Sequence, residues 1–189
     1  MRLERNRRVA SVWLLGGAVA VLGLGAGGWY LYAGDDGYRM DRSVCQKPGL
    51  PAVTRTVGDL RFDGGPEGQP PSGAEQLTCT YSALTGTGDA AKDVSAVVKI
   101  HVGEEGAAQD PGDLMAPPES RRVAVDGVGE KAYAVSAFGN DYQGLVVLDR
   151  NAAVTVEVTG RTVQGSLDLS TARPAMIDDV RALLAALEG

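Results

Sequence analysis

The first 32 residues constrain this chain most, because they join a basic head to a long apolar run. Residues 1–8 contain four arginines and one glutamate, whereas residues 9–32 contain no charged residue and one polar interruption, Ser11. A helix of 24 residues extends about 36 Å, enough to cross a hydrocarbon core of about 30 Å. The sequence therefore predicts a transmembrane helix over residues 9–32.

The charges on either side of this run predict its orientation. Arginines that precede a span favour the cytoplasmic side, and Asp35 and Asp36 follow on the other side. Trp29, Tyr30 and Tyr32 lie where an outer aromatic belt is expected. We therefore expect a single-pass plasma-membrane protein with a cytoplasmic N-terminus and an extracytoplasmic C-terminal part.

A cleaved signal peptide is the main alternative to an uncleaved signal anchor. Signal peptides usually have apolar regions of 7–15 residues, and this run is longer. Residues 31–33 form only a weak late cleavage site, and no lipobox cysteine closes the run.

Gly23 and Gly27 form a GxxxG spacing that lets helices pack closely. In so glycine-rich a span, chance spacing is favoured over homodimerisation.

The predicted organisation is a basic head (1–8), a span (9–32), a stalk (33–41) and one extracytoplasmic domain (42–189). The head takes four of the 18 basic residues and one of the 24 acidic residues, so the rest of the chain has a formal net charge of −9. Such an acidic domain repels nucleic acid. Nucleic acid is therefore excluded as an expected partner.

Cys45 and Cys79 are the only cysteines, and both follow the span. An even pair in an oxidising compartment is read as a disulfide. A reactive thiol is the sharper alternative, but nothing near either cysteine suggests an activating environment. The sequence therefore favours a structural disulfide.

Alternating apolar and polar residues predict an antiparallel sheet. Residues 93–102 alternate with a period of two, which is typical of a half-buried strand. Further strands are expected over residues 77–83, within 121–138 on both sides of a tight turn at Gly127–Gly129, and over 144–149 and 152–159. Residues 62–76 and 103–120 are rich in glycine and proline and are expected to be long loops.

Two helices are expected beside this sheet. A short helix begins at Pro51, which suits a first helical turn. A C-terminal helix follows Ser170 or Thr171 as the cap, with Asp178 and Asp179 near its start. Four of its apolar residues share one face, with Met176 and Leu183 beside it; the four are Ile177, Val180, Leu184 and Leu187. The predicted fold class is α+β, with an antiparallel sheet covered by helix on one side.

No catalytic, cofactor-binding or metal-binding residue is predicted. His101 is the only histidine, so neither a Ser-His-Asp site nor a histidine metal cluster is supported. The acidic residues of the second loop lack calcium-loop spacing; they are Glu104, Glu105, Asp110 and Asp113. Gly127 and Gly129 are read as turn residues in preference to an anion-binding nest.

The domain resembles a family of small actinobacterial envelope proteins of unknown function, many of them lipoproteins. The resemblance covers residues 42–188. It is carried by Cys45, by Cys79 at the entry to a strand, by the VDGVGEKAY turn at 125–133, by the paired strands around 145–158 and by the closing helix. It implies a fold similar to the PsbP-like α/β/α sandwich.

This chain departs from the family in two places. Tyr81 stands where the family often has tryptophan, and the lipobox is replaced by the predicted span. The second departure changes the tether and leaves the expected location the same.

Three functional hypotheses remain at this stage. The leading one is a non-catalytic binding or interaction module of the cell envelope, with a protein partner or a small ligand. The alternative is an accessory or sensor subunit that acts through its glycine-rich span. An enzyme is the least supported, because no reactive constellation is visible.

Overall fold

The structure is a computed structural model, and it describes residues 37–65, 75–103, 120–137 and 140–188. The chain divides into two units, Met1–Asp36 and Gly37–Gly189. The predicted span at 9–32 lies outside the described residues. Within the described ranges, no helix has the length and hydropathy needed to cross a membrane.

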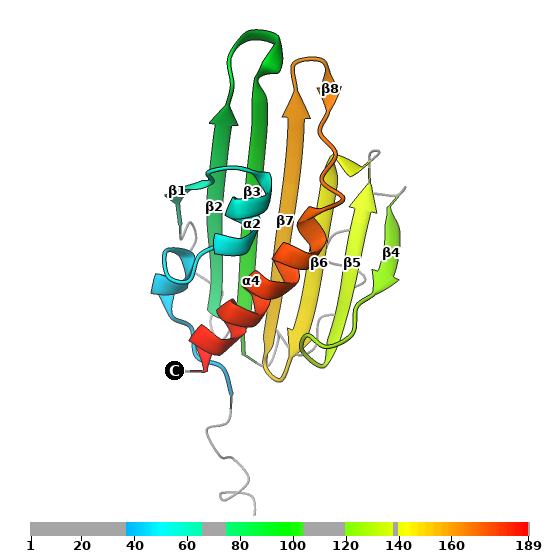
Figure 1. Ribbon diagram of the computed structural model, residues 1–189. Coiled ribbons are helices and arrows are strands. Elements are labelled where there is room, and N and C mark those ends of the chain that lie inside the picture. The colour runs from blue at the N-terminus through cyan, green and yellow to red at the C-terminus, as the bar shows by residue number, and fades with distance from the viewer. Residues whose placement is uncertain (1–36, 66–74, 104–119, 138–139, 189) are drawn as a thin grey trace, which may run out of the picture. The chain divides into compact units, whose positions relative to one another are not determined.

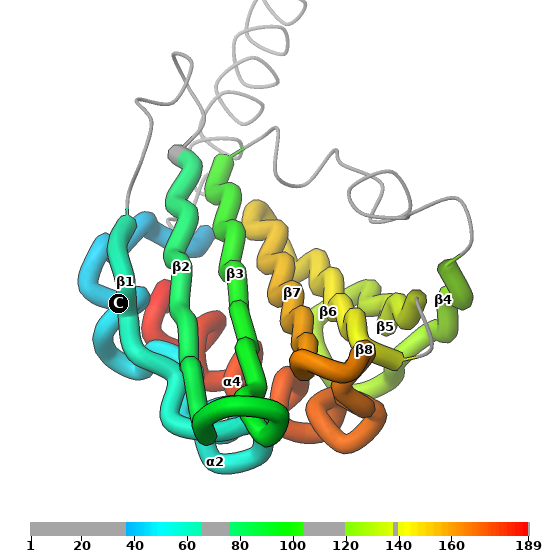
Figure 2. Tube along the Cα trace, turned by 90° about the horizontal axis from the view of Figure 1, so that it is seen from above, coloured from blue at the N-terminus to red at the C-terminus, as the bar shows by residue number. Residues whose placement is uncertain are grey.

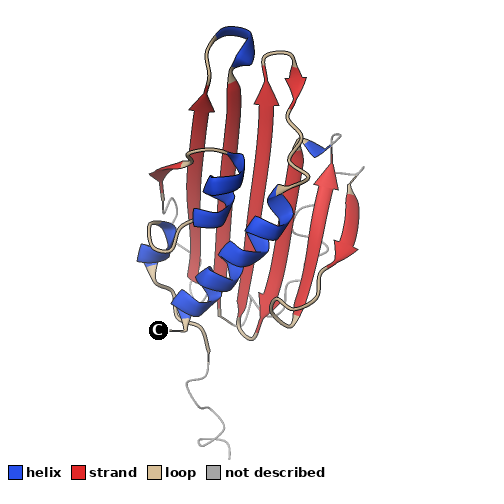
Figure 3. Cartoon of the chain, viewed as in Figure 1, coloured by secondary structure: helices blue, strands red, loops and turns tan. Residues whose placement is uncertain are grey.

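The described strands form one eight-stranded antiparallel sheet (Figures 1 and 3). Its order is β1-β2-β3-β7-β6-β5-β4, and β8 pairs with β7 beside that path. The strands are β1 (Arg61–Gly64), β2 (Glu75–Thr85), β3 (Lys92–Val102), β4 (Arg121–Ala124), β5 (Lys131–Ala137), β6 (Tyr142–Asp149), β7 (Ala152–Thr162) and β8 (Gly165–Ser166). The predicted α+β class with an antiparallel sheet is therefore confirmed.

The two α-helices that the structure describes lie on the same side of this sheet in both views (Figures 1 and 2). They are α2 (Pro51–Val57) and α4 (Ala172–Leu187), and two short 3₁₀ helices are η1 (Arg42–Cys45) and η2 (Gly88–Ala90). Helix α4 contacts α2 as well as β6 and β7. The last and first α-helices of the domain therefore form one layer over the sheet.

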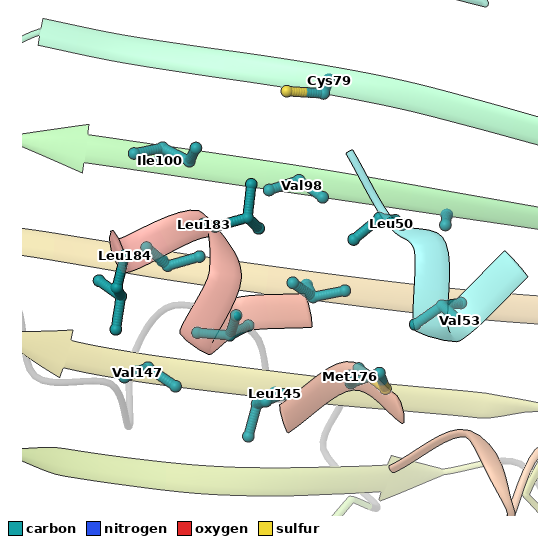
Figure 4. Packing of buried hydrophobic residues seen from close by; sticks show 14 of the residues in the cluster. Leu50, Val53, Cys79, Val98, Ile100, Leu145, Val147, Met176, Leu183 and Leu184 are labelled. Carbon is teal, nitrogen blue, oxygen red and sulfur yellow. The ribbon is translucent and has the colours of Figure 1, made fainter. Parts of the chain in front are cut away.

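The core lies between this helical layer and the central strands. On β3, alternate side chains from Val94 to Val102 are buried, and those between them are half-buried. Figure 4 shows Leu183 and Met176 of α4 and Val53 of α2 above the strands that carry Val98 and Leu145. The alternation of apolar and polar residues along β3 therefore correctly predicts which face of the strand packs on the helices.

One buried carboxylate connects the two α-helices. Asp179 of α4 is only 1% exposed. Its two oxygens accept the backbone N–H groups of Ala52 and Val53, each at 2.8 Å. These amides open α2, where no partner exists within the helix, and Leu50 at the N-cap provides no side-chain cap. A residue of the last helix therefore caps the first.

The domain is already ordered at Tyr38, within the predicted stalk at 33–41. The Tyr38 N–H donates to Asn151 Oδ1 at 2.7 Å, and Asn151 Nδ2 donates to the Tyr38 carbonyl at 3.2 Å. The Tyr38 hydroxyl donates to Asp149, and the Arg150 guanidinium lies 4.0 Å from the Tyr38 ring centroid. We call these four residues the Tyr38 clasp; it fixes the incoming chain to the β6–β7 hairpin.

The loop expected over residues 62–76 is wrong at both ends, because residues 62–64 belong to β1 and residues 75–76 belong to β2. Strand β1 pairs with β2, and Phe62 packs against Tyr81 with ring centroids 5.6 Å apart. Pairing with β2 therefore determines the conformation of residues 62–64, although the glycine and proline content nearby is typical of a loop. Residues 66–74 of the same predicted loop, and residues 104–119 of the second one, lie outside the described residues.

The C-terminal helix begins after Thr171 as predicted, but the expected roles of its polar residues need correction. Thr171 is the N-cap of α4, but its side chain makes no capping hydrogen bond. The first turn of α4 contains no acidic residue. Asp178 and Asp179 follow in a later turn, where Asp178 is exposed and Asp179 is buried. The two residues therefore have different roles: Asp178 pairs with Arg181 at the surface, and Asp179 accepts amides of α2. Neither caps its own helix.

Replacing Asp179 with alanine is expected to destabilise the domain strongly. Both opening amides of α2 would remain buried without an acceptor, which costs about 1–3 kcal/mol per group. We expect the free energy of unfolding to fall by about 2–4 kcal/mol, measured by urea denaturation of the full-length protein with circular dichroism. Asp178→Ala is the matched control, because its exposed pair with Arg181 is worth less than about 1 kcal/mol. Equal losses in both variants would contradict the capping role.

Asp179 also predicts a pH dependence of stability. Burial raises the pKa of its carboxyl above the usual 3.8, while the hydrogen bonds from Val53 and Ala52 oppose that shift. Between the pKa of the unfolded chain and the raised pKa of the folded state, the folded protein therefore holds a proton that the unfolded chain has already released. The free energy of unfolding should fall as pH rises from about 4 through the folded pKa. Subtracting the free energy of unfolding of Asp179→Asn from that of the wild type isolates the contribution of this carboxyl. We expect this difference to fall as pH rises, and a difference that rises with pH would refute the raised pKa.

Candidate functional site

A groove of about 300 Å³ opens beside the disulfide, between the start of α2 and strands β1 and β2. Five of the residues that line it are large and apolar: Pro48, Leu50, Pro51, Leu60 and Phe62. The polar side chains on the wall are those of Gln46, Thr54 and Tyr81. We call this hollow the apolar groove.

The Cys45–Cys79 disulfide forms as predicted, and it positions one end of the apolar groove. It joins η1 to β2 with a Cα–Cα distance of 5.5 Å. Both cysteines are buried, at 2% and 0% exposure. They are therefore shielded from exchange with external thiols, and their contribution to the groove is structural.

Tyr81 forms a second connection across the same region. Its hydroxyl donates to the Cys45 carbonyl oxygen at 2.6 Å. Burial raises the pKa of the Tyr81 hydroxyl, and the negative charge of Asp179 raises it further. The hydroxyl therefore stays protonated and keeps this donor role. Its ring meets the Phe62 ring at an interplanar angle of 60°, a tilted arrangement that suits aromatic pairs.

A second hollow of about 320 Å³ lies on the opposite face of the same sheet edge. It is lined by Asp63, Gly64, Gly65, Thr78 and Thr80. On β2, Thr78 and Thr80 alternate with the buried Leu77, Cys79 and Tyr81, so they point away from the helices. We call this hollow the polar hollow.

Gly127 and Gly129 lie at the turn between β4 and β5, with φ of +78° and +59°. These values favour glycine. A Cβ at Gly129 would lie 2.6 Å from the Leu148 carbonyl oxygen, so the close approach excludes a side chain there. Arg181 of α4 donates to the Gly127 carbonyl from Nη2 at 3.0 Å. The turn is therefore held against α4, far in sequence from the apolar groove.

His101 lies on β3, on the face that points away from the helices. Its side chain is half-buried, and burial together with nearby Lys99 lowers its pKa. Lys99 pairs with Glu157 at 2.9 Å. In the part of the chain that the structure describes, no three histidine, cysteine or acidic residues gather as metal ligands. Glu104, Glu105, Asp110 and Asp113 of the acidic loop lie outside it.

Sequence reasoning identified the disulfide but missed the apolar groove and the polar hollow. The groove collects residues from three separate segments, at 45–54, 60–62 and 81. The available signal was Phe62, a large apolar residue within a stretch read as a loop. Its 37% exposure in the structure marks it as a side chain that the fold leaves partly uncovered.

Comparisons of the chain with protein-family models, with curated proteins and with solved structures find no match.

Removing the disulfide should destabilise the domain without changing its fold class. The bond joins residues 34 apart, and closing such a loop is worth about 3–4 kcal/mol on the chain-entropy model. We expect the double variant Cys45→Ala/Cys79→Ala to lose about this free energy of unfolding in urea denaturation. Reducing the wild type should give a similar loss, whereas reductant should leave the double variant unchanged. An unchanged midpoint in the double variant would contradict the expected contribution.

Proposed function

We propose that this protein is a membrane-anchored binding module whose domain works outside the plasma membrane. The basic head and the uncharged run over 9–32 support the anchor and its orientation. The Cys45–Cys79 disulfide supports an oxidising location. The resemblance to the actinobacterial envelope family is part of the same proposal, supported by the cysteine pair, the glycine turn and the closing helix.

The apolar groove carries the proposal of binding. Among the residues that the structure describes, no aspartate, glutamate, lysine, arginine or histidine lines it. Proton transfer and hydrolysis need convergent ionisable groups, and the described polar side chains of this wall are an amide and two hydroxyls. Its volume of about 300 Å³ is at the lower end of ligand pockets. The groove therefore suits recognition of an uncharged group better than catalysis.

The proposal is tested by photo-crosslinking in living cells. A photoreactive residue replaces Thr54, which is half-buried on the groove wall. The control replaces Leu84, which is 78% exposed on β2 but does not line the groove. We expect a specific product from position 54 only, and Phe62→Ala should reduce its yield because it removes part of the wall. Equal products at both positions, or none at position 54, would count against a groove ligand.

A span-swapped version distinguishes this proposal from the accessory-subunit alternative. Residues 9–32 are exchanged for an unrelated transmembrane helix in the same crosslinking variant. We expect the product from position 54 to persist, because the groove lies in the domain. Loss of the product with the domain still displayed outside would favour action through the glycine-rich span.

A further inference from the structure

Strand β1 is the outermost described strand on its side of the sheet, and in Figures 1 and 2 it lies at the edge beside β2. It pairs with β2 through Arg61, Phe62 and Gly64, with a register shift between the last two. An edge strand presents backbone donors and acceptors that an extended chain can pair with. This edge also carries Phe62, a partly exposed aromatic side chain.

The apolar groove and the polar hollow flank β1 on opposite faces. Phe62 lines the groove on the helical side, whereas Asp63 lines the hollow on the other side. Consecutive side chains of a regular extended partner strand point to opposite faces. A strand added beside β1 would therefore direct one side chain toward the groove and the next toward the hollow.

We propose that β1 accepts an extended segment of a protein partner as an added strand, with an aromatic or large aliphatic residue in the apolar groove and an adjacent lysine or arginine in the polar hollow. This inference rests on the proposed binding function and names the kind of partner that the groove receives.

The chemistry of the two hollows sets this pattern. Leu60, Phe62 and the Tyr81 ring offer apolar contact without a charge on the groove wall, so a charged partner residue would lose its hydration there. On the other face, the Asp63 carboxylate and the hydroxyls of Thr78 and Thr80 are acceptors for a cationic donor.

Two glycines line the polar hollow. Gly64 and Gly65 contribute backbone only, and a Cβ at Gly65 would lie 2.7 Å from the Thr78 carbonyl oxygen. Arg61 precedes this segment opposite Ser82 and does not line the hollow. Among the described residues that line the hollow, Asp63 is therefore the charged one that a partner side chain meets.

The proposal is tested with a displayed library of random short peptides selected against the purified full-length protein in detergent. We expect enriched peptides to place an apolar residue next to lysine or arginine. Phe62→Ala should weaken their binding about tenfold, and Asp63→Asn about threefold. Methylating the peptide amides that face β1 should weaken binding about tenfold by removing ladder hydrogen bonds. Val123→Ala, at the exposed opposite edge strand β4, should leave binding unchanged.

The outcomes separate this inference from the proposed function. Peptides that need Phe62 but tolerate backbone methylation would overturn strand addition and leave a groove-binding module standing. A library that enriches no peptide, together with a product at position 54 in cells, would overturn the peptide partner while a groove ligand remains. Failure of both experiments would overturn both proposals. Concentration-dependent dimers that Phe62→Ala abolishes, in the absence of peptide binding, would replace the partner with a second copy of this chain.

Discussion

The two hydrogen bonds to the Asp179 carboxylate hold the helical layer together. They connect α4 to the opening turn of α2, and the bonded residues are 127 and 126 positions apart in the sequence. Leu50 and Pro51 stand just before those capped amides and also line the apolar groove. The geometry of the groove therefore depends on a residue that does not touch it, because a displaced α2 would take this wall with it.

The predictable part of the fold is the part encoded by local periodicity. The alternation along β3 and the apolar side of α4 both correspond to buried faces, since burial on one side imposes a period of two on a strand and 3.6 on a helix. Asp179 shows where this reasoning stops. In the sequence, Asp179 follows Asp178 near the start of a helix, where acidic residues favour the helix dipole. In the structure, however, its hydrogen-bond partners belong to another helix.

The candidate site was less predictable than the fold, for a similar reason. The Cys45–Cys79 pair could be inferred by counting, but a wall assembled from separate segments has no local signature. Phe62 lies within a glycine- and proline-rich stretch of the sequence. Its position in the sheet is set by its contact with Tyr81 and by the pairing of β1 with β2. A sheet edge flanked by two unlike hollows is visible only when both faces are described.

The Tyr38 clasp has a mechanical consequence. A pull on the chain from its N-terminal side enters the domain at Tyr38 and passes through Asn151 and Asp149 into the β6–β7 hairpin. Strands β6 and β7 lie in the interior of the sheet, each bonded on both sides. A load that reaches this hairpin is therefore shared with the hydrogen-bond ladders on both sides of each of its strands.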